Sequence, residues 1–180
     1  MLKRLRLFIS SKGVLKFMPK EKAKDYWETG WEEPRNGCDV YGVRGPFGIC
    51  RISESPICEC LDGFAPESYV EWSRGNWSEG CVRRTKLLCE KNFSNLDTNG
   101  GKNNGFRNIE RMKLTDFYEY VEPAKSEDRC HRWCLNSCSC QASAYVNSIG
   151  CLVWSERLID MECSSDEAAL FLRLAHSELG

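Results

Sequence analysis

Four of the chain's cysteines lie within eleven residues, in the run Cys130-His131-Arg132-Trp133-Cys134-Leu135-Asn136-Ser137-Cys138-Ser139-Cys140. Ser126 is a candidate N-cap for a helix over this run, and the two acidic residues after it would lie in the first turn, where the helix dipole favours negative charge. Cys130, Cys134 and Cys138 recur every fourth residue, so we expect their sulfurs on one face of the helix. Sulfurs in this pattern are expected to bind either other sulfurs or a metal ion.

The composition favours disulfides. The chain has 12 cysteines in 180 residues, all between Cys38 and Cys163. Within this part their density approaches that of small secreted domains, which use disulfides because their hydrophobic cores are small. The triplets Asn76-Trp77-Ser78 and Asn92-Phe93-Ser94 are N-glycosylation acceptors and agree with an exported chain. A net charge of −1 gives no indication of a nucleic-acid partner.

A zinc site is the alternative to disulfides, because thiolates bind zinc tetrahedrally. It would use Cys130, Cys134, Cys138 and Cys140, but their spacing differs from the usual short ligand pairs. The other eight of the 12 cysteines would then remain unexplained. We therefore expect disulfides, with no metal and no other cofactor.

No group of residues in the sequence predicts catalysis. The two histidines are His131 and His176, and His131 follows Cys130 on the predicted helix, where the two side chains face different directions. We expect His131 to be an exposed surface residue rather than the base of a Cys–His pair. Phosphate-binding loops and kinase motifs are also missing from the sequence, so we expect no enzyme activity.

Near the start of the chain, Leu5, Leu7 and Ile9 alternate with polar or large residues and precede the run Ser10-Ser11-Lys12-Gly13. This pattern predicts two short strands joined by a turn, with no partner sheet supplied by the sequence. An apolar run of the roughly 7–15 residues that a signal peptide needs, or the roughly 20 of a membrane span, is missing. We therefore expect an incomplete chain.

The segment from Cys38 to Cys81 is rich in glycine, cysteine and aromatic residues and lacks helical periodicity. Glycines at positive φ permit tight turns while neighbouring rings fill a small interior. Cys58-x-Cys60 followed by Gly63-Phe64 and Gly80-Cys81 is typical of an EGF-like module; a generic cysteine-rich loop is the alternative.

Longer motifs in this segment are specific to one family. They are Cys38-Asp39-x-Tyr41-Gly42, Gly45-x-Phe47-Gly48-x-Cys50, Cys58-x-Cys60-Leu61-x-Gly63-Phe64-x-Pro66 and Trp77-Ser78-x-Gly80-Cys81-Val82-Arg83-Arg84. These motifs resemble the S-locus glycoprotein domain of plant S-domain, or G-type lectin, receptor-like kinases. The cysteine helix, Gly150-Cys151-Leu152-x-Trp154 and Leu170-x-Leu172-Arg173-Leu174 resemble the PAN/apple domain of the same family.

The resemblance implies a small, disulfide-rich, β-leaning α+β fold. Residues 1–25 would be the remnant of the end of a bulb-type lectin domain, and residues 26–88 an S-locus glycoprotein or EGF-like module. Residues 89–180 would form a PAN/apple domain, with one helix packed on a small antiparallel sheet. We expect strands at 109–114, 142–146, 151–154 and 169–174. Arg83-Arg84 is expected to be an exposed charge pair.

The resemblance also implies a set of disulfides. The expected pairs are Cys38–Cys50, Cys60–Cys81, Cys89–Cys138, Cys130–Cys151 and Cys134–Cys140. Where the family has a further cysteine this chain has Arg44, which leaves Cys58 without its partner. Cys163 lies outside the family pattern, so we expect Cys58 and Cys163 to be free or mismatched.

The function implied by the resemblance is recognition in a receptor ectodomain, at the plasma membrane or outside the cell. The best-known members of the family recognise self pollen by binding a small secreted cysteine-rich protein, and the receptor dimerises. We expect a truncated or non-functional relative with a protein or peptide ligand, without nucleic-acid partner or membrane span. A soluble secreted S-locus-glycoprotein-like binder and a cytosolic zinc-binding protein are the alternatives.

The ligand is expected to contact two loops, residues 67–76 and residues 92–108, because loops carry function on rigid scaffolds. A glycan on Asn92 would shield part of the second loop and favours the first. Tyr69, Trp72 and Trp77 could instead stack on a sugar ring, although aromatic residues in a small disulfide module more often form its core.

Overall fold

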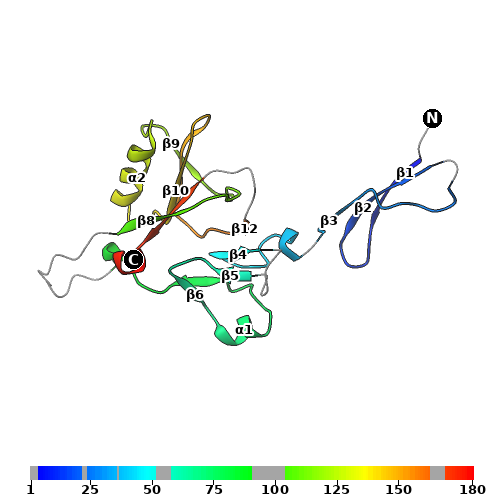
Figure 1. Ribbon diagram of the computed structural model, residues 1–180, viewed down its shortest axis with the longest axis horizontal. Coiled ribbons are helices and arrows are strands. Elements are labelled where there is room, and N and C mark those ends of the chain that lie inside the picture. The colour runs from blue at the N-terminus through cyan, green and yellow to red at the C-terminus, as the bar shows by residue number, and fades with distance from the viewer. Residues whose placement is uncertain (1–3, 22–23, 36, 52–57, 91–103, 163–168) are drawn as a thin grey trace, which may run out of the picture. The chain divides into compact units, whose positions relative to one another are not determined.

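The computed structural model describes residues 4–21, 24–35, 37–51, 58–90, 104–162 and 169–180. The chain forms two compact units, Met1–Val43 and Arg44–Gly180. It is a small, disulfide-rich and β-rich protein with few helices (Figure 1). In the described part, no helix has the length and apolar character needed to cross a membrane.

The first unit contains a three-stranded antiparallel sheet in the order β1-β2-β3, formed by β1 (Arg4–Ile9), β2 (Leu15–Lys20) and β3 (Trp31–Glu33). Trp31 lies opposite Phe17 in this sheet, and a Lys16–Glu32 ion pair of 2.6 Å joins the same two strands. The expectation of a hairpin without a further strand is therefore wrong. A three-residue strand is too short to show period-two alternation in the sequence.

The second unit is built around a five-stranded antiparallel sheet in the order β8-β13-β10-β11-β9. Its strands are β8 (Gly105–Ile109), β9 (Glu119–Val121), β10 (Ala142–Val146), β11 (Gly150–Trp154) and β13 (Leu170–Leu174). The helix α2 (Glu127–Asn136) packs on β10 and β11. The bounds expected for the strand at 109–114 are wrong, because the observed strand β8 ends at Ile109, where the expected strand begins. The strand β9 was missed because three residues are too few to show a clear alternation.

Two smaller sheets complete the second unit. One contains β4 (Gly48–Cys50), β5 (Cys58–Cys60) and β12 (Met161–Glu162), and the other contains β6 (Phe64–Pro66) and β7 (Cys81–Arg83), with the short helix α1 (Tyr69–Ser73) between them in the chain. We call residues 44–88 the first module and residues 89–180 the second module. Because β12 pairs with β4, the two modules share a sheet.

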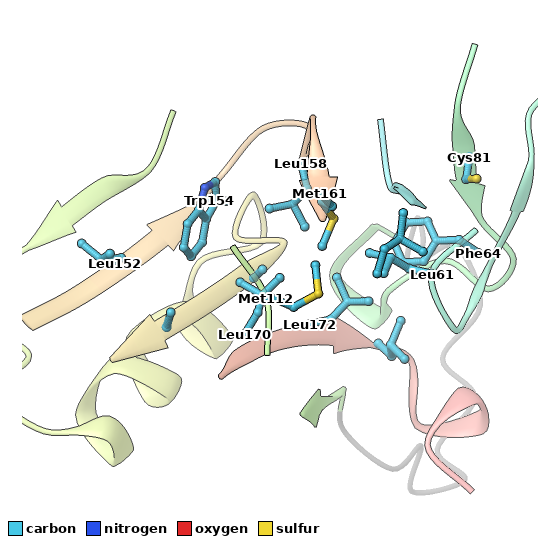
Figure 2. Close-up of a cluster of buried hydrophobic side chains, with 14 residues drawn as sticks. Leu61, Phe64, Cys81, Met112, Leu152, Trp154, Leu158, Met161, Leu170 and Leu172 are labelled. Atoms are coloured by element: carbon cyan, nitrogen blue, oxygen red, sulfur yellow. The ribbon is translucent and has the colours of Figure 1, made fainter. Parts of the chain in front are cut away.

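The two modules also share a hydrophobic core (Figure 2). Its buried members are Ile49, Leu61, Phe64 and Cys81 from the first module, and Met112, Ala142, Ala144, Leu152, Trp154, Leu158, Met161, Leu170, Leu172 and Leu174 from the second. Side chains of a strand alternate between its two faces. In β11, Leu152 and Trp154 therefore face this core, whereas Cys151 and Val153 belong to a second cluster under α2. The second module is thus packed on both faces of its sheet.

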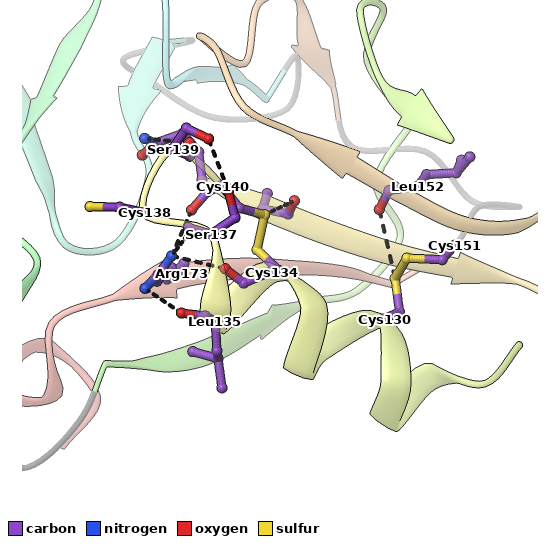
Figure 3. Close-up of a disulfide and its surroundings, with 12 residues drawn as sticks. Cys130, Cys134, Leu135, Ser137, Cys138, Ser139, Cys140, Cys151, Leu152 and Arg173 are labelled. Atoms are coloured by element: carbon purple, nitrogen blue, oxygen red, sulfur yellow. Dashed lines mark hydrogen bonds between the residues drawn. A yellow bond between two sulfur atoms is a disulfide. The ribbon is translucent and has the colours of Figure 1, made fainter. Parts of the chain in front are cut away.

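The helix α2 is held to the sheet by sulfur (Figure 3). Cys130 and Cys134 are fully buried; Cys130 is bonded to Cys151 of β11, and Cys134 to Cys140. The helix ends at Asn136, so Cys138 lies beyond it and bonds to Cys89. The expectation that all three sulfurs share one helical face is therefore wrong for Cys138.

The start of α2 also differs from its expected capping. Ser126 occupies the N-cap position with extended backbone, but its side chain makes no capping hydrogen bond. The two acidic residues of the first turn are Glu127 and Asp128. Their charges therefore remain as the favourable electrostatic feature of this end.

A buried arginine binds the other end of α2 (Figure 3). The Nη1 group of Arg173, in β13, donates to the carbonyls of Cys134 (2.9 Å) and Ser137 (2.5 Å). It also donates to the carbonyl of Cys140 (3.3 Å), and Nη2 donates to the carbonyl of Leu135 (3.0 Å). The last carbonyls of a helix lack partners within the helix, and a cation there also complements the helix dipole. Burial lowers the pKa of Arg173, against the opposing charge of Glu90.

Replacing this arginine with an apolar residue of similar length is expected to destabilise the fold. We expect Arg173→Met to lower the free energy of unfolding by about 3 kcal/mol, because several buried carbonyls lose a charged donor. The matched control is Arg132→Met, which removes an exposed arginine of α2 whose Nε donates to the carbonyl of Asp128. Chemical denaturation with disulfides intact measures both, and equal losses in the two variants would contradict a special role for Arg173.

Candidate functional site

A groove of about 960 Å³ lies between the two modules of the second unit. Its apolar lining includes Pro46, Phe47, Phe64, Val82, Phe117 and Ile159, and its charged lining consists of Glu67, Glu79, Arg83, Glu90, Glu156 and Arg157. The first module supplies one wall, and the loops around β9, β10 and β11 supply the other. Its shape therefore depends on the shared core that fixes the two modules together.

Two phenylalanines of the groove adopt the left-handed backbone conformation, which bulky residues rarely occupy. They are Phe47, with φ of 56°, and Phe117, with φ of 62°. The surrounding structure holds Phe47 in place, because its amide donates to the carbonyl of Leu158 (2.8 Å) and its ring stacks on Phe64 with centroids 4.5 Å apart. Phe117 is different, because its side chain is 68% exposed. Such backbone outliers cluster at functional sites.

Arg83 forms part of the groove floor and is committed to internal contacts. Its guanidinium lies 4.9 Å from the centre of the Phe64 ring, and Nη2 donates to Oε1 of Gln141 (2.5 Å). Nη1 donates to the carbonyl of Arg173. Burial lowers the pKa of Arg83. The expected exposed pair Arg83-Arg84 is therefore wrong for Arg83, whereas Arg84 is exposed and pairs with Glu178 at 2.9 Å.

The rim of the groove is acidic. Glu67, Glu79 and Glu156 are exposed, and none of their carboxylates makes a hydrogen bond or ion pair with a residue that the structure describes. The carboxylate of Glu90 accepts a hydrogen bond from the amide of Leu87 (3.0 Å). Arg157 is exposed and, among the described lining residues, is the basic side chain that is not committed to internal contacts.

Arg44, at the position where the resemblance implies a cysteine, is fully buried. It forms an ion pair with Asp160 of the second module, so a charge pair joins the modules here. Cys58 is a buried free thiol. Burial raises the pKa of Cys58, and the charge of Arg44 acts in the opposite direction.

The remaining predicted disulfide residues lie as follows. Cys60 is bonded to Cys81. Cys38 and Cys50 are each disulfide-bonded, and their mutual pairing stays a prediction. Cys163 lies outside the described residues. The four cysteines of the alternative zinc site, Cys130, Cys134, Cys138 and Cys140, belong to three different disulfides, so their thiolates are not available as a set.

Of the two glycosylation acceptors, Asn76 is exposed and Asn92 lies outside the described residues. The Oδ1 atom of Asn76 accepts a hydrogen bond from the hydroxyl of Ser78 (2.8 Å), and its Nδ2 group donates to Glu71 (3.0 Å). Its amide is thus at the surface, where an oligosaccharide has room.

The two expected contact loops are only partly described. Residues 67–76 contain the helix α1, whose Tyr69 is 69% exposed. Trp72 packs against the shared core, while Trp77 is half-buried, so these aromatic side chains differ in exposure. In the second loop, residues 92–103 lie outside the described residues, and β8 already begins at residue 105.

His131 is half-buried between two rings, contrary to the expected exposed surface residue. Its ring centroid lies 5.0 Å from that of Phe106 and 4.2 Å from that of Phe171. Its Nε2 atom is buried and has no hydrogen-bond partner among the described residues. Burial lowers the pKa of His131, and the charges of Glu127 and Asp128 oppose this shift.

Comparison with known proteins places this fold in a family. Residues 2–68 match the model of the S-locus glycoprotein domain, and residues 89–161 match the model of the PAN-like domain. The chain belongs to the family of S-domain proteins. It is 46% identical over 175 residues to the G-type lectin S-receptor-like serine/threonine-protein kinase At1g61480 of Arabidopsis thaliana, and 45% identical over 175 residues to At1g61440 of the same organism.

Each of these alignments covers 97% of this chain. The S-domain chain spans about a fifth of the length of these curated relatives, 21% in both cases. The boundaries expected at residues 25 and 88 stay a prediction.

The environment of His131 predicts a pH dependence of stability. Its folded-state pKa lies below that of the unfolded chain, which is about 6.5. As the pH falls through this range, the unfolded state takes up the proton first, so the free energy of unfolding decreases towards low pH. We expect His131→Phe to reduce this loss between about pH 7 and about pH 5. Thermal unfolding at several pH values is the measurement.

The control for this measurement is His176→Gln, which replaces an exposed histidine. It should leave the acid dependence unchanged. If His131→Phe keeps the full dependence, another group is responsible for it.

The Arg44–Asp160 pair is suited to a double-mutant cycle. Arg44→Met alone leaves Asp160 without the guanidinium and should destabilise the fold by about 3 kcal/mol, the lower end for a broken buried pair because Asp160 is partly exposed. Adding Asp160→Asn should recover part of this loss, since it removes the charge and asparagine tolerates the left-handed backbone at this position, with φ of 63°. Denaturant unfolding of Arg44→Met, of Asp160→Asn and of the double variant is the measurement. If the loss in the double variant equals the sum of the losses in the two single variants, the pair is not coupled.

Proposed function

We propose that the chain is an extracellular recognition segment of an S-domain receptor-like kinase and binds a protein or peptide ligand. The observation that carries the proposal is the alignment of 97% of the chain with the G-type lectin S-receptor-like kinases. Because the chain aligns with 21% of these relatives, a recognition role is favoured over a kinase activity of its own. Recognition of the pollen or self-incompatibility type, and receptor dimerisation, belong to this proposal.

Three features of the molecule support an extracellular location. The helix α2 is cross-linked by disulfides, which persist in oxidising compartments. The amide of Asn76 is exposed within an acceptor sequence. The Cys60–Cys81 bridge and the pairings β4–β5 and β6–β7 of the first module also fit an EGF-like arrangement, which is typical of secreted proteins.

The alternative is a soluble secreted binder related to the S-locus glycoprotein. Both functions use the same recognition surfaces, and they differ in whether the segment is joined to a membrane helix and a kinase. Reading the genomic sequence on both sides of the coding region separates them.

The proposal is tested by directing the full chain into the secretory pathway of plant cells behind a heterologous signal peptide. We expect secreted protein with an N-glycan that endoglycosidase removes and that Asn76→Gln reduces. The secreted chain is then screened by surface plasmon resonance against small secreted cysteine-rich peptides, with binding expected in about the micromolar range or tighter. Retention inside the cell without a glycan, or failure to bind any member of the panel, would contradict the proposal.

A further inference from the structure

The groove between the modules has an apolar floor that remains accessible. Phe47 is half-buried in it and stacks on the buried Phe64, and Val82, also in the lining, is 45% exposed. Phe117 projects from the second module with most of its surface in solvent. Aromatic side chains of this kind often supply a large part of the binding energy in protein interfaces. The floor is therefore suited to an apolar side chain of a partner.

The charges around this floor determine whether the groove attracts a positively or a negatively charged partner. The carboxylates of Glu67, Glu79 and Glu156 have no partner among the described residues, so they are available to a ligand. Arg83 is not available, because its donors are used by Gln141 and by the carbonyl of Arg173. Within the described lining, Arg157 is the basic residue that opposes the three carboxylates. The rim therefore attracts cations and repels nucleic acids and acidic peptides.

We propose that the groove binds an extended peptide segment with an apolar side chain flanked by basic side chains. This inference rests on the proposed recognition function and names the chemistry of its ligand. The apolar side chain packs against Phe117, Val82 and the accessible part of Phe47, and lysines or arginines reach the carboxylates of the rim. The free volume of about 960 Å³ accommodates a few side chains of such a segment.

The test uses the full secreted chain and fluorescein-labelled synthetic peptides in fluorescence anisotropy. One peptide has a central phenylalanine flanked by lysines, a second has glutamates in place of the lysines, and a third has serine in place of the phenylalanine. We expect the first to bind in about the micromolar range and the other two to bind at least tenfold more weakly, or about 1.4 kcal/mol. Affinity for the first peptide should fall as the salt concentration rises.

Variants of the chain locate the binding. Phe117→Asn removes the ring while asparagine tolerates the left-handed backbone, so the fold should be retained, and affinity should fall about tenfold. Glu156→Gln and Glu79→Gln together should weaken binding several-fold and reduce its salt dependence. The matched controls are Glu122→Gln, an exposed glutamate outside the groove lining, and Tyr69→Ala in the loop 67–76.

The outcomes separate this inference from the proposed function. The inference is overturned if the lysine–phenylalanine peptide does not bind, if the glutamate peptide binds equally well, or if the groove variants leave binding unchanged. If secreted cysteine-rich peptides bind and only Tyr69→Ala weakens them, the recognition function stands and the ligand site lies in the loop 67–76. If neither set of peptides binds, both proposals fall.

Discussion

The second module depends on the hydrogen bonds that the guanidinium of Arg173 donates to carbonyls at the end of α2. The guanidinium lies in a buried place where several carbonyls converge, at the end of α2 and in the turn that follows. A charge buried without partners would be strongly unfavourable, but here both terminal nitrogens of the guanidinium meet carbonyl oxygens. The two cross-links beside it, Cys134–Cys140 and Cys89–Cys138, restrict the same turn. Sulfur and guanidinium together hold the end of α2 and the turn after it in place.

The strand β13 connects this site to the rest of the molecule. Leu170, Leu172 and Leu174 belong to the core that the two modules share, while Phe171 and Arg173 extend towards α2. The carbonyl of Arg173 accepts a hydrogen bond from Arg83 on the groove floor. One strand therefore positions the helix, the shared core and the groove. This arrangement explains why the walls of the candidate site can come from different modules and still have a defined shape.

The first module contains a buried arginine where the resemblance implies a cysteine. Cys58 is a buried free thiol, and the ion pair of Arg44 with Asp160 connects the modules. A disulfide links two backbone positions covalently, whereas an ion pair depends on its desolvation and on good geometry. The Arg44–Asp160 ion pair connects the two modules electrostatically, next to the parallel pairing of β12 with β4.

The amino-acid sequence by itself determined the family, the β-rich disulfide-linked class and the helix around Cys130 and Cys134. These features follow from local spacing, because a helix repeats every few residues and cysteine motifs are read within short windows. Tertiary structure alone decided that β3 completes a sheet, that His131 is enclosed by Phe106 and Phe171, and that Arg173 binds the end of α2. It also decided that residues of both modules line one groove. The residues involved are separated by tens of positions along the chain, and a side chain's burial depends on partners that no local pattern contains.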